Sequence, residues 1–110
     1  MESNEIKKII PFADIWDNLN VLEKRLLEIS SSSNNYLTSI SQYLINAGGK
    51  RFRPIVTSLA GKFGNEIENV KKIIDAGVCV ELIHIGSLYH DDVMDNATTR
   101  RGVESSNSKW

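Results

Sequence analysis

The sequence Glu81-Leu-Ile-His-Ile-Gly-Ser-Leu-Tyr-His-Asp-Asp-Val-Met-Asp95 is apolar for most of its length and ends in three carboxylates within five residues. Its apolar side chains recur at helical spacing, which predicts the last turns of a long helix. In that helix Asp91 and Asp95 lie one turn apart on one face, and Asp92 lies about 100° further round. Stacked carboxylates repel each other, and the C-terminal end of a helix disfavours anions. A divalent cation would offset both penalties and Mg²⁺ prefers oxygen ligands, so we expect Asp91 and Asp95 to bind it.

Two further features near these acids favour an anionic ligand. His84 lies seven residues before Asp91, two turns earlier on the same stripe of the helix. Arg100-Arg101-Gly102 begins five residues after Asp95. Carboxylates that hold a metal, together with a pair of guanidinium groups, provide what a phosphate ligand needs. The alternative is that these charged residues are only solvated ends of a helix and a turn.

A second charged segment, Gly49-Lys-Arg-Phe-Arg-Pro54, places three cations directly before a predicted helix: Lys50, Arg51 and Arg53. Pro54 pre-sets the first helical position, so we expect the helix to start there. Free backbone N–H groups and the dipole at a helix start favour anions. The glycine pair at 48–49 also lets the backbone approach a ligand closely. The segment therefore favours phosphate binding, with a solvated basic turn as the alternative.

The remaining sequence predicts an all-α fold. Apolar residues keep the helical period in four segments, and neither sustained strand-like alternation nor an Asn-Gly hairpin is present. We expect helices at residues 12–29, 36–47, 54–63 and 66–95. The last residues, 96–110, are expected to form a loop that turns into a further helix near Ser105. Cys79 lies among apolar neighbours in the longest helix, so we expect it to be buried and unreactive.

The totals bound the class of protein. The chain has 110 residues, and we treat 1–110 as a single partial domain because the terminal Trp110 suggests a cut inside a larger fold. A net charge of −1 provides no field for nucleic acid or an anionic membrane. A single cysteine excludes an internal disulfide, and the N-terminus lacks the basic start of a signal peptide, so cytoplasm is expected. No apolar stretch is judged long enough for a stable membrane span.

Three motifs, in this order and at this spacing, resemble the N-terminal third of the trans-isoprenyl diphosphate synthases, the polyprenyl synthetase family. They are Gly-Gly-Lys-Arg-Phe-Arg-Pro at 48–54, Glu-Leu-Ile-His at 81–84 with Asp-Asp-Val-Met-Asp at 91–95, and Arg-Arg-Gly at 100–102. The resemblance covers residues 36–110 well and the first helix loosely. It implies an N-terminal fragment of the isoprenoid-synthase helical bundle that carries the first aspartate-rich motif. The basic element distinguishes this family from terpene cyclases, which do not bind a second diphosphate.

The resemblance implies head-to-tail condensation of isopentenyl diphosphate with an allylic prenyl diphosphate. Asp91 and Asp95 match the Mg²⁺ ligands that hold the allylic diphosphate, and Asp92 matches the supporting carboxylate between them. Arg100 matches the arginine that contacts the same diphosphate. The positions that match those holding isopentenyl diphosphate are Lys50, Arg53, His84 and Arg101. Loss of the allylic diphosphate leaves a carbocation, the isopentenyl double bond attacks it, and a proton is then lost to the diphosphate.

The resemblance also implies a determinant of product length. From the acid cluster, the hydrocarbon tail would run back along the helix past Ser87 and Gly86, where short-chain family members carry large aromatic rings. Both residues are small here, and Ile83 one turn deeper would line an apolar channel. A medium to long chain product is therefore expected. The alternative is that Gly86 and Ser87 are small only to let another helix pack closely.

Family members are considerably longer, and their second aspartate-rich motif does not occur in this sequence. We therefore expect a fragment that is inactive alone. The full-length parent enzyme is expected to be a homodimer. The first alternative is a small or regulatory subunit of a heteromeric prenyl diphosphate synthase, although the retention of every N-terminal motif residue argues against a purely non-catalytic role. The second alternative is a helical interaction module with no ligand.

Overall fold

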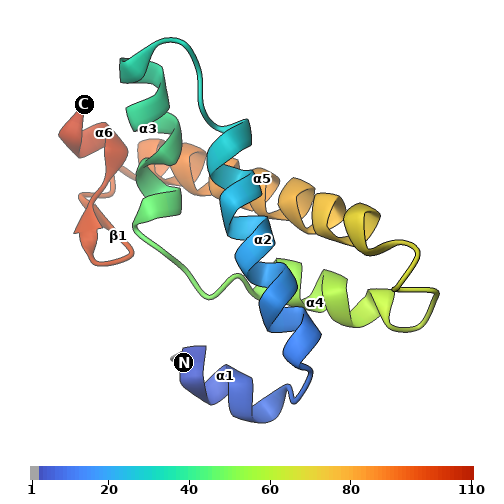
Figure 1. The fold of residues 1–110 in the computed structure, drawn as a ribbon. Helices are drawn as coiled ribbons and strands as arrows, with labels where there is room; N and C mark the ends of the chain where they lie inside the picture. The colour runs from blue at the N-terminus through green and yellow to red at the C-terminus, as the bar shows by residue number, and fades with distance from the viewer. Residues whose placement is uncertain (1–2) are drawn as a thin grey trace. The chain divides into compact units, whose positions relative to one another are not determined.

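The computed structural model describes residues 3–110, and within this range most of the chain is helical (Figure 1). The helices are α1 (Ser3–Ile9), α2 (Ala13–Ile29), α3 (Asn35–Asn46), α4 (Phe52–Gly61), α5 (Val70–Asp95) and α6 (Ser106–Lys109). Two short strands, β1 (Thr99–Arg100) and β2 (Val103–Glu104), form an antiparallel pair. The predicted all-α class is confirmed.

The four predicted helices are present, with shifts at several of their ends; α3 ends at Asn46 rather than 47, and α4 at Gly61 rather than 63. Helix α4 begins at Phe52, two residues before the proline that was expected to start it. Proline is tolerated there because the first turn of a helix does not use its N–H groups. Helix α5 begins at Val70 rather than at residue 66, and residues 66–69 form a turn. Helix α1 was not predicted, because seven residues are too few to display a clear apolar period.

The segment after α5 contains a tight hairpin rather than the loop that the sequence suggested. Asn96 ends α5 with a left-handed backbone (φ 51°). The two residues between the strands, Arg101 and Gly102, also have positive φ angles of 53° and 76°. Two consecutive positive φ angles match the twist of paired strands and favour a two-residue turn. The helix expected near Ser105 is present as α6, and the Ser105 hydroxyl accepts a hydrogen bond from the Ser108 N–H at 3.3 Å.

The chain divides into two units, which are described separately: residues 1–24 with 50–81, and residues 25–49 with 82–110. In the first unit the buried side chains that pack α2, α4 and α5 are Ile15, Leu22, Pro54, Ile55 and Val78. Gly77 permits the close approach of α2, because a Cβ atom there would lie 2.8 Å from Leu22 Cδ1. The glycine in this part of α5 therefore has a packing role.

In the second unit, Tyr89 fastens α5 to α3. Its hydroxyl donates to the Ile40 carbonyl at 2.5 Å and accepts from the Leu44 N–H at 3.2 Å. Burial raises the pKa of the Tyr89 hydroxyl, so it stays protonated and can donate. Tyr43 on α3 in turn donates to the Glu104 carbonyl at 2.6 Å and packs edge-on against Trp110, with ring centroids 5.1 Å apart. These contacts position the segment that carries Arg100 and Arg101.

Two expectations about α5 are wrong. Cys79 is exposed, because it lies about 100° round the helix from its buried neighbour Val78, and apolar sequence alone does not say which face packs. The helix is also long and apolar enough to cross a membrane by length and composition, since only Asp75 and Glu81 are charged between Lys72 and Asp91. One such helix is weak evidence, because the core helix of a globular protein passes the same test.

Candidate functional site

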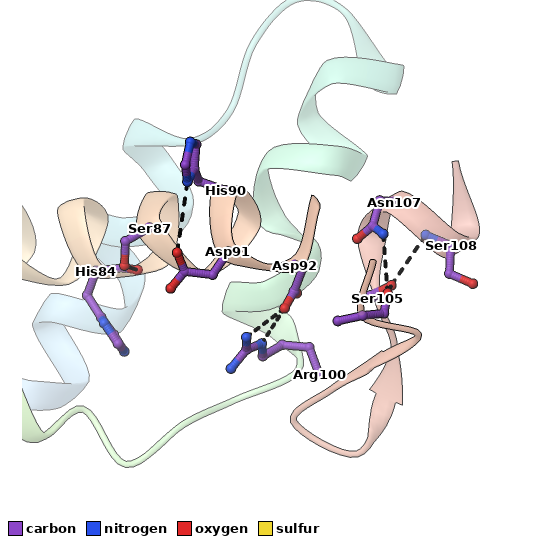
Figure 2. A network of polar contacts seen from close by, with 10 residues as sticks. His84, Ser87, His90, Asp91, Asp92, Arg100, Ser105, Asn107 and Ser108 are labelled. Atoms are coloured by element: carbon purple, nitrogen blue, oxygen red, sulfur yellow. Dashed lines mark hydrogen bonds and ion pairs between the residues drawn. The ribbon is translucent and has the colours of Figure 1, made fainter. Parts of the chain in front are cut away.

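The three carboxylates at the end of α5 lie in two environments, and Figure 2 shows one residue of each kind, Asp91 and Asp92. Asp91 and Asp95 are exposed, and the Asp91 side chain retains 60% of its accessible surface. Asp92 is completely buried. This division follows from helix geometry, because Asp92 points about 100° away from Asp91, whereas Asp95 returns to nearly the same face. The two acids that were expected to bind metal are therefore accessible to a ligand.

Asp92 holds the guanidinium group of Arg100. Its Oδ1 atom accepts hydrogen bonds from Arg100 Nη2 at 2.6 Å and from Arg100 Nε at 3.0 Å. Its Oδ2 atom is also buried but has no hydrogen-bond partner within residues 3–110. The middle carboxylate of the motif thus positions an arginine, and one of its two oxygens is left unsatisfied.

All three carboxylates act electrostatically on Arg100. The hydrogen bond to Asp92 raises the pKa of the Arg100 guanidinium, while burial opposes that change. The negative charges of Asp91 and Asp95 raise this pKa further. The guanidinium therefore lies within the field of the whole acidic motif, and its Nη1 atom has no hydrogen-bond partner in the described part of the chain. Arg100 can still donate to an anion while Asp92 holds it.

Arg101 and His84 belong to the same unit as the acids. Arg101 donates from Nη1 to the Leu44 carbonyl at 2.8 Å, which ties the hairpin turn to the last turn of α3. His84 is half-buried on α5, and its backbone carbonyl accepts a hydrogen bond from the Ser87 hydroxyl at 2.6 Å. In the view of Figure 2, His84 and Arg100 point to the lower side of α5, and His90 points to the upper side.

The residues expected to control product length also lie at this end of α5. Gly86, Ser87 and Ile83 are all exposed. A Cβ atom built at Gly86 would meet nothing within 4 Å, unlike one at Gly77. Within residues 3–110, therefore, no helix packs closely on Gly86, and the small residue has no packing partner of the kind that Gly77 has.

The three cations of the basic loop, residues 48–53, lie in the first unit, which resumes at Lys50. Lys50 and Arg53 are exposed, as a phosphate-binding role requires, but Arg51 is buried with only 5% of its surface accessible. The Arg51 guanidinium contacts the carboxylates of Glu23 on α2 and Glu81 on α5. The expectation that all three cations form one exposed basic set is therefore wrong for Arg51. A signal was available in Glu81, since a carboxylate in the apolar part of a helix is costly without a cation.

The donor set fits Mg²⁺ only in part. Residues 3–110 contain no cluster of three or more His, Cys, Asp or Glu side chains that could hold a metal. Mg²⁺ is commonly bound through one or two carboxylates, with substrate phosphates and water completing the octahedron. Asp91 and Asp95 have the residue type, the spacing and the exposure for that arrangement. They match a metal that arrives with a diphosphate rather than a cage made by protein alone.

Comparison with known proteins agrees with this combination of fold and charged motifs. A family model described as polyprenyl synthetase matches residues 34–110. The heptaprenyl diphosphate synthase component 2 of Bacillus subtilis (strain 168) is 36% identical over 107 residues, which is 97% of this chain and 30% of that protein. The nonaprenyl diphosphate synthase of Mycobacterium tuberculosis (strain ATCC 25618 / H37Rv) is 48% identical over 68 residues, which is 62% of this chain and 20% of the relative.

A solved structure is similar as well. The crystal structure of heptaprenyl diphosphate synthase from Staphylococcus aureus superposes with a TM-score of 0.82 at 33% identity, covering 87% of this chain and 30% of that one. The chain thus spans 20 to 30% of the length of these relatives. The matched region contains the basic loop, the acidic end of α5 and the Arg100–Arg101 turn. The chain belongs to the polyprenyl synthetase family.

Proposed function

We propose that this chain forms the N-terminal substrate-binding part of a trans-polyprenyl diphosphate synthase. The reaction joins isopentenyl diphosphate to an allylic prenyl diphosphate and releases diphosphate. The observation that carries the proposal is the pair of exposed charge sets within the matched family region: Asp91 and Asp95 in one unit, Lys50 and Arg53 in the other. Two sets of opposite sign suit two diphosphates that are held differently, one through a metal and one directly by cations.

In this proposal the acidic end of α5 holds the allylic substrate. Asp91 and Asp95 would hold Mg²⁺, which when bound neutralises charge on the leaving diphosphate. Arg100 donates from its remaining N–H groups to the same diphosphate, and Asp92 keeps its guanidinium oriented. Orientation of a donor in advance lowers the cost of stabilising the charge that develops when the C–O bond breaks. No nucleophilic side chain is required, because the isopentenyl double bond is the nucleophile.

The basic loop is proposed to hold isopentenyl diphosphate. Lys50 and Arg53 are exposed cations beside the N-terminal end of α4, where N–H groups and the helix dipole also favour anions. The family resemblance adds His84 and Arg101 to this substrate. Arg101 donates one N–H to the Leu44 carbonyl, so part of its guanidinium group holds the turn in this structure.

Product length is proposed to depend on the exposed strip Gly86, Ser87 and Ile83. No side chain at Gly86 or Ser87 is large enough to stop a growing tail one turn below the acids. The names of two relatives, heptaprenyl and nonaprenyl diphosphate synthase, support a medium to long product. Ser87→Phe should shorten the product distribution, measured by chromatography of the dephosphorylated alcohols. An unchanged distribution would show that the tail does not pass Ser87.

A second candidate function is one subunit of a two-component synthase. Two similar relatives, from Bacillus subtilis and Geobacillus stearothermophilus, are each named component 2. A homodimer is the first proposal for the parent enzyme, and sedimentation of that enzyme with and without a candidate second component distinguishes the two. A cytoplasmic location is also part of the proposal, and it rests on the reducing environment that suits a lone cysteine.

Turnover by an intact synthase that contains these residues tests the function. The enzyme should convert labelled isopentenyl diphosphate and an allylic diphosphate into longer prenyl diphosphates, and chelation of divalent cations should stop it. Prenyl products that form equally well in excess chelator would contradict the role of Asp91 and Asp95. Failure to form any product with either a homodimer or the two-component mixture would contradict the synthase proposal itself.

A further inference from the structure

Arg51 differs from the two cations beside it. Lys50 and Arg53 are exposed, whereas the Arg51 side chain has only 4% of its surface accessible. An arginine is rarely buried unless it is paired, and here the pairing is extensive. Arg51 belongs to the basic motif in sequence, yet it cannot contact a diphosphate from the position that it occupies.

The Arg51 guanidinium group joins three segments of the first unit. Its Nε and Nη2 atoms donate to the two carboxylate oxygens of Glu23 on α2, at 2.6 Å and 3.2 Å. Its Nη1 atom lies 3.3 Å from Glu81 Oε1 on α5. Glu81 is 2% exposed, while the Glu23 side chain is 40% exposed. Bonding to both oxygens of one carboxylate requires the planar guanidinium group of arginine, which lysine does not have.

The backbone at Arg51 is also unusual. Arg51 has φ 53° and ψ 38°, which is the left-handed region, and it is the N-cap of α4. Gly48 and Gly49 before it have positive φ angles of 88° and 156°. A residue with a side chain adopts the left-handed region at a cost, so the surrounding structure must hold it there. The bonds to Glu23 and Glu81 provide that restraint at the point where the loop enters α4.

We propose that Arg51 is a positioning residue for isopentenyl diphosphate binding. Its guanidinium fork, held by Glu23 and Glu81, fixes the left-handed turn that keeps Lys50 and Arg53 on the exposed side of the loop. This inference rests on the proposed function of the basic loop. The competing explanation is that the buried ion pairs only stabilise the unit, in which case substrate affinity should not depend on them once the protein is folded.

Two variants of the intact synthase separate these explanations. Glu23→Gln removes the charged partner that makes two of the bonds, and its partial exposure means that folding should survive the change. Arg51→Gly removes the side chain but still permits the positive φ angle. Asp14→Asn is the matched control, since it removes another α2 carboxylate from an ion pair in the same unit, with Lys62 Nζ at 2.8 Å.

The readout is the Michaelis constant for each substrate, measured on protein shown to be folded by circular dichroism. We expect Glu23→Gln to raise the constant for isopentenyl diphosphate about tenfold, and Arg51→Gly about a hundredfold if it folds, because misplaced binding groups lose affinity on that scale. The constant for the allylic substrate should stay within about twofold in each variant, and Asp14→Asn should change neither.

The outcomes distinguish this inference from the proposed function. If the unmodified synthase is active and folded Glu23→Gln binds isopentenyl diphosphate as well as it does, the positioning role is wrong while the function stands. Equal increases for both substrates would also overturn the positioning role, because they indicate general loosening of the fold. If the unmodified protein makes no prenyl product, the proposed function itself fails.

Discussion

The basic loop around Arg51 and the acidic end of α5 around Asp92 each carry three like charges. In both, the middle residue in sequence is buried against opposite charge, and the outer two are exposed. The two motifs differ in how completely the buried residue is satisfied. Arg51 donates to the carboxylates of both Glu23 and Glu81, whereas Asp92 has one arginine partner and a buried oxygen with none in the described residues.

This difference indicates that Arg51 and Asp92 have different roles. The two carboxylates that Arg51 contacts belong to α2 and α5, so this anchor is separate from the groups that would contact substrate. The partner of Asp92 is Arg100, which is itself a proposed ligand for the allylic diphosphate. In the basic loop the anchor and the proposed binding groups are therefore distinct, while in the acidic motif the anchor holds a proposed binding group directly.

The largest effect should come from the exposed acids. Asp91→Ala or Asp95→Ala in the intact synthase should lower turnover by roughly a hundredfold or more, because the metal that neutralises the leaving diphosphate loses a ligand. Steady-state rates at saturating substrates and Mg²⁺ measure this. Activity within about tenfold of the unmodified enzyme would show that these acids are not essential ligands.

The exposed cations should give the next largest effect, confined to one substrate. Lys50→Ala or Arg53→Ala should raise the Michaelis constant for isopentenyl diphosphate roughly ten- to a hundredfold, since each lost charge-assisted hydrogen bond contributes about 1.5–3 kcal/mol. The constant for the allylic substrate should change far less. Comparable increases for both substrates would mean that the division between the two motifs is wrong.

The buried carboxylate should affect stability more than the exposed ones do. Asp92→Asn removes the charge that pairs with Arg100, and we expect the free energy of unfolding of this chain to fall by about 1–3 kcal/mol in urea titrations. Asp95→Asn is the control, and it should not lower stability, because an exposed acid at the C-terminal end of a helix is unfavourable. Equal destabilisation by Asp92→Asn and Asp95→Asn would contradict the stabilising role of the buried carboxylate.

The smallest effect should come from an ion pair outside both motifs. The hydrogen bond and charge of Lys62 hold the pKa of Asp14 below its usual value in the folded chain. A lowered folded pKa means that the pair stabilises the chain above the unfolded pKa, and that this contribution is lost as the pH falls through the folded pKa. Asp14→Asn should therefore lower the melting temperature slightly at neutral pH and not at all in strong acid. A difference that grows in acid would contradict the sign of this shift.

The positions of the helices could be predicted well from the sequence, whereas the buried polar contacts could not. The apolar period located α2 to α5, because a face that must be buried repeats every turn in the sequence. The same pattern could not show that Arg51 and Asp92 turn inward while Lys50, Arg53, Asp91 and Asp95 face solvent. The sequence alone does not show which of several neighbouring like charges is buried. The burial of Arg51 and Asp92 depends on Glu23, Glu81 and Arg100, which lie elsewhere in the chain. The exposure of Cys79 was missed for the related reason that an apolar helix has packed and unpacked faces.

Direct binding measurements on the intact synthase test the central claim that the two motifs serve different diphosphates. Calorimetry with isopentenyl diphosphate, and separately with a non-reactive allylic diphosphate analogue and Mg²⁺, would be carried out on the unmodified protein, Lys50→Ala and Asp91→Ala. We expect each variant to affect one ligand: Lys50→Ala loses affinity for isopentenyl diphosphate only, and Asp91→Ala loses the Mg²⁺-dependent affinity for the allylic analogue only. If each variant weakens both ligands equally, the claim is contradicted.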